Sequence, residues 1–101
     1  MAYQQGQFHA ALGAAAGDDH ALQAELRAAF LESVERQLDL LRRARCDGNW
    51  RIAAERLHTI AGSFHFEELR QLADEAIRAA PGEPTIIASL AGLAEELRAH
   101  A

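Results

Sequence analysis

The sequence predicts an all-α fold, an antiparallel four-helix bundle with a short additional N-terminal helix, and three observations support this prediction. No stretch of useful length alternates apolar and polar residues as a strand does, and β-branched residues are few. Apolar residues instead recur at steps of three and four, as on one face of a helix. Glycine, proline and aspartate divide the chain into five such segments. With 101 residues, half of them hydrophobic, the chain fits a single domain, residues 1–101.

The first two helices are expected on either side of Gly17. Residues 4–16 place apolar side chains on one side, and Gly17 suits a helix C-terminus. We expect this segment to cover one end of the bundle. The long second helix is expected over residues 19–45, because Asp18 or Asp19 can accept the free amide hydrogens of its first turn.

Three further helices are expected after the turn at residues 47–49. Asn49 is the expected N-cap of the third helix, whose inward stripe is Trp50, Ala53, Leu57, Ile60 and Phe64. A break is expected within residues 63–66, because a five-residue step precedes Leu69, where the next stripe begins. Pro81-Gly82-Glu83-Pro84 ends the fourth helix, and a fifth runs from Pro84 to about Arg98.

Composition excludes several functional classes. Fifteen acidic residues against ten basic ones, all arginine, give a formal net charge of −5, which argues against a duplex nucleic-acid partner. Cys46 is the only cysteine, so an intrachain disulfide and a multi-cysteine zinc site are excluded. No eighteen apolar residues run together, so no membrane partner is expected. We expect a monomeric, cytoplasmic protein.

His58 occupies an unusual face of the third helix. At about 100° per residue, the core stripe of that helix lies roughly 100 to 160° away from His58, so the ring is expected to point outward. The residues one turn away are small: Ala54, Ala61 and Gly62. Glycine costs a helix interior roughly 1 kcal/mol relative to alanine. We interpret Gly62 as a gap that lets another protein approach the imidazole.

The segment His58-Thr59-Ile60-Ala61-Gly62-Ser63 resembles the His-x-Leu-Lys-Gly-Ser core of histidine-containing phosphotransfer (HPt) domains of bacterial multistep phosphorelays. The order of helices along nearly the whole chain is also similar to that family. The resemblance implies that His58 accepts a phosphoryl group from an aspartyl phosphate on a receiver domain of a response regulator or hybrid histidine kinase. The receiver would supply the magnesium ion, so the chain needs no cofactor of its own.

The same resemblance implies a docking surface around His58 and along a flank of the long helix. Its expected members are Arg51, Ala54, Glu55, Ala61, Gly62, Ser63 and His65. Separately, the chain has no GxxxxGK[ST] motif and no lysine with which to hold a nucleotide. We therefore expect a phosphoryl carrier without autonomous kinase activity, and not an enzyme.

Three alternatives remain open at this point. Ala61 stands where the family usually has lysine, which favours a degenerate module that binds receivers without accepting phosphate. His58 could also be a plain exposed histidine on a helical bundle. Glu55-x-x-His58 has the spacing found in carboxylate-bridged di-metal bundles, but no second such motif exists in the chain, so no metal ligands are assigned.

Overall fold

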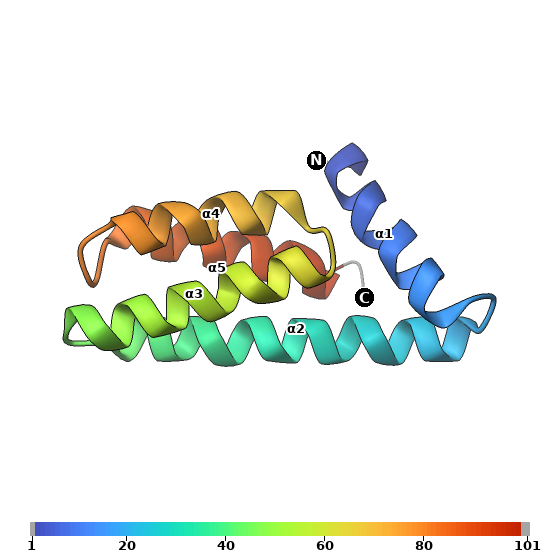
Figure 1. The fold of residues 1–101 in the computed structure, drawn as a ribbon, viewed down its shortest axis with the longest axis horizontal. Helices are drawn as coiled ribbons and strands as arrows, with labels where there is room; N and C mark the ends of the chain where they lie inside the picture. The colour runs from blue at the N-terminus through green and yellow to red at the C-terminus, as the bar shows by residue number, and fades with distance from the viewer. Residues whose placement is uncertain (1, 100–101) are drawn as a thin grey trace.

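The structure, a computed structural model, describes residues 2–99. It contains five helices: α1 (Ala2–Ala16), α2 (His20–Arg43), α3 (Asp47–Ser63), α4 (Glu67–Arg78) and α5 (Pro84–Ala99) (Figure 1). No strand occurs among the described residues. The prediction of an all-α fold is confirmed.

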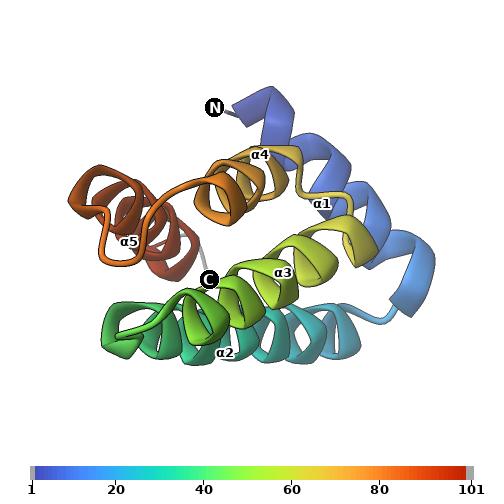
Figure 2. The ribbon, with the colours of Figure 1, turned by 60° about the vertical axis from the view of Figure 1, so that its left-hand side comes forward.

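Helices α2 to α5 form the four-helix bundle. Each of them contacts the next along the chain, and α5 returns to α2, so the ring of helices is closed. Successive helices run in opposite directions (Figures 1 and 2). The body measures 44 × 21 × 21 Å, with the bundle axis along the longest direction. The antiparallel bundle agrees with the periodicity of the sequence.

Apolar side chains from all five helices form one core. Trp50, near the start of α3, is almost fully buried, and its Nε1–H donates a 2.7 Å hydrogen bond to the Ala76 carbonyl oxygen in α4. Burying an indole is favourable when its N–H finds an acceptor. Trp50 therefore fixes α3 against α4.

Helix α1 lies obliquely across one end of the bundle, over the N-terminal half of α2 (Figures 1 and 2). Its Phe8 is fully buried and packs on Phe30, Phe64 and Phe66, at ring-centroid distances of 4.7, 6.3 and 5.1 Å. Gly17, with φ of 64°, ends this helix, and the Asp19 side chain accepts a 3.0 Å hydrogen bond from the Leu22 amide at the start of α2. These helix ends agree with the sequence prediction.

The start of α3 differs from the prediction. The helix begins at Asp47, with Cys46 as its N-cap residue, so Asn49 lies inside the first turn and is not the cap. An acidic residue in the first turn interacts favourably with the positive end of the helix dipole, and Asp47 provides this. Helix α2 ends at Arg43, because Ala44 is already extended.

The break between α3 and α4 lies within residues 63–66, as predicted. His65 has φ of 56°, in the left-handed region. The Phe66 amide donates to the Ala61 carbonyl at 2.9 Å, and the His65 amide donates to the Gly62 carbonyl at 3.3 Å. This pair of bonds is a Schellman motif. It turns the chain so that Phe66 is fully buried, whereas Phe64, which we expected in the core, is only half-buried.

Candidate functional site

His58 lies at the border between core and solvent. It is partly buried, between the exposed Glu55 and Gly62 on one side and the fully buried Ala54 and Ala61 on the other. The ring is therefore neither a core side chain nor a freely exposed one. Its position is closer to α4 than the helical wheel alone predicts.

The prediction that Ala54 and Ala61 belong to an exposed docking surface is wrong. Both are 0% exposed. Helix α3 packs against α2 and α4 together, so the face that it buries is wider than its stripe of large side chains. The two alanines lie on the side of α3 from which Trp50 reaches α4. They fill the α3–α4 seam, and no partner can contact them.

Arg51, Glu55 and Gly62 are exposed on the same side of α3 as His58. Arg51 Nε lies 3.7 Å from Glu55 Oε2, so these two charges face each other. A Cβ added to Gly62 would meet no atom within 4 Å. The fold therefore does not require glycine at this position, and the space beside it is open to a partner.

Ser63 and His65 are exposed but belong to a different hollow. They line a depression of about 610 Å³ together with one glutamine and four alanines of α1: Gln7, Ala10, Ala11, Ala14 and Ala15. The Ser63 hydroxyl donates to the Thr59 carbonyl oxygen at 3.0 Å. The expected docking residues thus divide into an exposed strip beside His58 and a hollow at the end of α3.

An ion pair at the start of α4 was not predicted as part of the site. Arg70 Nε donates a 2.8 Å hydrogen bond to Glu67 Oε2, and Arg70 Nη2 contacts Glu67 Oε1, so the guanidinium grips the carboxylate with two nitrogens. The hydrogen bond from Arg70 is the main reason that the pKa of Glu67 lies below its usual range. His58 adds a smaller charge interaction that also lowers the pKa of Glu67.

The sequence carries a signal for this pair. Because the chain reverses at residues 63–66, the last turns of α3 lie beside the first turns of α4. The Glu67-x-x-Arg70 spacing places both charges on one side of α4. The structure brings Glu67 close enough to His58 for their charges to interact, which requires the exact position of the turn.

The arrangement is suited to attack on an anionic electrophile. A neutral imidazole has an unprotonated ring nitrogen, which is a nucleophile. Arg70 provides a cation on the neighbouring helix, and a guanidinium can bind phosphoryl oxygens with two N–H groups. Gly62 leaves room for the group that carries the electrophile.

Within residues 2–99, no three histidine, cysteine, aspartate or glutamate side chains gather where they could hold a metal ion. The Glu55-x-x-His58 motif therefore gains no support as part of a metal site. In the same part of the chain, no helix combines the length and the apolar character of a transmembrane segment.

Comparison of the chain with protein-family models, curated proteins and solved structures found no match.

Proposed function

We propose that this protein is a histidine phosphotransfer protein in a multistep two-component phosphorelay. His58 takes a phosphoryl group from the aspartyl phosphate of one receiver domain and passes it to the aspartate of another. The observation that carries the proposal is a partly exposed imidazole on a bundle helix, one turn from a glycine that the fold does not need. The resemblance of the helix order along the chain to HPt domains also supports it.

Transfer follows an in-line course. A bond forms between a ring nitrogen of His58 and phosphorus while the bond from phosphorus to the aspartyl oxygen breaks. The receiver's aspartate leaves as a carboxylate, and negative charge spreads over the three peripheral phosphoryl oxygens. The receiver supplies the magnesium ion. This chain contributes the nucleophile, the docking surface and a nearby cation.

Arg70 is the cation best placed to act in place of the lysine that Ala61 replaces. Arg51 lies on the same side of α3 as His58 but two turns, about 10 Å of helix, away, and Arg56 lines a groove on the opposite, α2 side of that helix. Arg70 pairs with Glu67, the carboxylate that also interacts with His58. Arg70 would exchange one of its bonds to Glu67 for a bond to a phosphoryl oxygen.

The test is transfer from a radiolabelled, phosphorylated receiver domain. We expect the label to move to this chain as an acid-labile, alkali-stable adduct. His58→Gln should abolish the transfer, while His20→Gln, at the start of α2, serves as the matched control. Arg70→Gln should slow the transfer by about tenfold, the effect expected when one charge-assisted hydrogen bond is lost.

A binding-only module is the second candidate, favoured by the lack of a basic side chain on α3 at position 61. It predicts that the two proteins co-purify while the label stays on the receiver. Failure of both transfer and co-purification with every receiver tested would overturn the phosphorelay proposal.

A further inference from the structure

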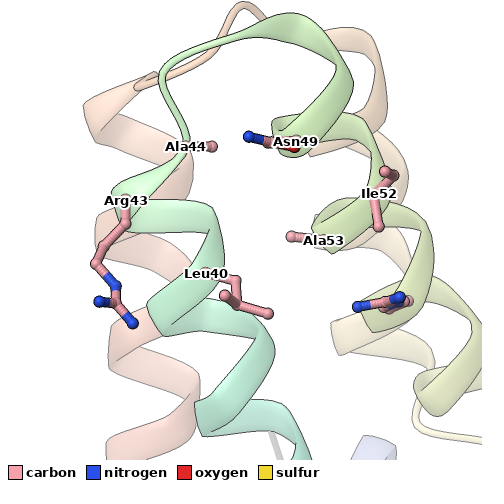
Figure 3. A pocket seen from close by; sticks show the side chains of 7 residues that line it. Leu40, Arg43, Ala44, Asn49, Ile52 and Ala53 are labelled. Carbon is pink, nitrogen blue, oxygen red and sulfur yellow. The ribbon is translucent and has the colours of Figure 1, made fainter.

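A second hollow lies on the other side of α3, between its N-terminal half and the end of α2 (Figure 3). Its volume is about 470 Å³. The residues that line it are Leu40, Arg43 and Ala44 from α2 and the turn after it, and Asn49, Ile52, Ala53 and Arg56 from α3. We call this hollow the α2–α3 groove.

Two large apolar side chains are exposed in this groove. Leu40 is 40% exposed and Ile52 is 48% exposed, and they come from the two helices that form its walls. Among the residues whose burial is described, Leu22 is the one other exposed large hydrophobic residue, and it lies near the far end of α2. Single exposed apolar residues are ordinary, so the case for a contact surface here depends on these two lying together and on the charge around them.

The charge of this region is opposite to that of the rest of the chain. Residues 36–56 contain six arginines and three acidic residues, a net charge of +3, whereas the other residues contain four arginines and twelve acidic residues, a net charge of −8. Arg43 and Arg56 line the groove from the two helices. Arg43 pairs with Asp39 at 2.9 Å, but Arg56 has no ion-pair partner among residues 2–99.

We propose that the α2–α3 groove binds an acidic amphipathic helix of a partner protein. The apolar face of that helix would cover Leu40 and Ile52, and its carboxylates would pair with Arg43 and Arg56. Two neighbouring helices make a groove that receives a third helix through side chains at i, i+3 or i+4, and i+7. The proposal goes beyond phosphotransfer and does not depend on His58, which lies on the α4 side of α3.

A second copy of the chain is a less suitable occupant. In such a pair, the acidic surface of one copy would be the hollow between α4 and α5, which Glu68, Glu75 and Glu96 line. Pairing that hollow with the α2–α3 groove would join two different surfaces of the chain head to tail. Such contacts form open chains of copies unless the rotation from one copy to the next closes a ring. Two copies also each carry a net charge of −5, so their mean electrostatic interaction is repulsive.

Two synthetic helical peptides test the proposal. Both are on the order of 16 residues, about 24 Å of helix, and both carry leucines on one face. The positions that flank the leucines are glutamate in one peptide and lysine in the other. Titration into ¹⁵N-labelled full chain should shift the amide resonances of residues 40–56 with the glutamate peptide and not with the lysine peptide. The affinity should fall as salt rises from about 50 to about 500 mM, because exposed charge pairs are screened.

Two variants and two matched controls identify the surface. Ile52→Gln and Arg56→Glu should each weaken binding of the glutamate peptide by about tenfold, through loss of apolar burial and reversal of charge. Leu22→Gln and Arg78→Glu make the same kinds of change on other exposed surfaces and should leave the affinity unchanged.

Three results would overturn the proposal. The first is equal binding of the two peptides, and the second is absence of shifts at residues 40–56 with the glutamate peptide at millimolar concentration. The third is an oligomer in sedimentation that Ile52→Gln dissolves, which would assign the groove to a second copy. Phosphotransfer to His58 is measured separately, so its failure leaves each of these results unaffected.

Discussion

At Gly62 the proposed function and helix stability favour different residues. It lies in the last turn of α3, is exposed, and has open space where a side chain would stand. Nothing in the fold requires its conformational freedom. This open space lies one helical turn from His58, and in the proposed function it admits the receiver domain to the imidazole.

Two substitutions at Gly62 therefore test the stability effect and the steric effect separately. Gly62→Ala should raise the free energy of unfolding by about 0.5 kcal/mol, because glycine is a poor helix former. Gly62→Gln should also fold, but its long side chain should suppress transfer to His58. Urea unfolding and the receiver transfer assay measure the two effects.

Gly92→Gln, at an exposed and equally uncrowded position in α5, is the matched control. It should have a similar effect on folding and none on transfer. Transfer at the original rate in Gly62→Gln would show that the steric explanation is wrong.

At the level of single residues, the sequence predicted that the His58 ring points outward. The structure leaves it partly buried, with Glu55 and Gly62 exposed on one side and Ala54 and Ala61 buried on the other. The wheel placed Trp50, Ala53 and Leu57 correctly in the core, and Ile60 is partly buried against it. It treated Ala54 and Ala61 as surface because small side chains contribute little to an apolar stripe. The interaction of Glu67 with His58 could not be predicted without the exact geometry of the turn that joins the two helices.

The positions of the helices follow closely from the sequence. The α3–α4 connection is the least regular one, and it shows where sequence patterns fall short. Gly17, Asp19 and Pro84 mark helix ends by well-understood backbone and capping preferences, and all three do so in the structure. The α3–α4 connection has no glycine at the left-handed position. There the sequence predicted a break from the spacing of apolar residues, but not that Phe66 would replace Phe64 in the core.

His65 offers a direct test of that connection. A histidine at φ of 56° carries a conformational cost that glycine avoids. His65→Gly should therefore stabilise the protein by about 0.5 to 1 kcal/mol, after part of the gain is lost to the greater freedom of glycine in the unfolded chain. Urea unfolding measures the change.

His65→Ala removes the imidazole but keeps the left-handed strain, so it should give no such gain. Equal stabilisation by alanine and glycine would show that the imidazole itself, and not the backbone, is unfavourable there.

In the whole molecule, helices α2 to α5 form a closed ring, and α1 covers one end of the bundle. Four phenylalanine rings meet there: Phe8 from α1, Phe30 from α2, and Phe64 and Phe66 from the α3–α4 connection. Arg27 of α2 lies beneath this cover. It is 9% exposed, and its guanidinium carbon is 5.4 Å from the centre of the Phe8 ring.

Arg27 is the clearest site at which the whole fold can be made more stable. None of its three side-chain nitrogens has a hydrogen-bond partner among the described residues, and burial lowers its pKa. A cation–π contact contributes about 0.5 to 2 kcal/mol. This offsets only part of the cost of removing a charge from water. Arg27→Met keeps the length of the side chain and its contact with Phe8 but removes the charge.

Arg27→Met should raise the free energy of unfolding by about 1 kcal/mol and the melting temperature by about 4 to 8 °C, as measured by calorimetry. Arg36→Met, on the exposed face of the same helix, should change stability by less than about 0.5 kcal/mol. A loss of stability in Arg27→Met would mean that the guanidinium has a partner that anchors α1 to the bundle. A gain would mean that the aromatic cluster holds α1 in place and that the buried charge opposes it.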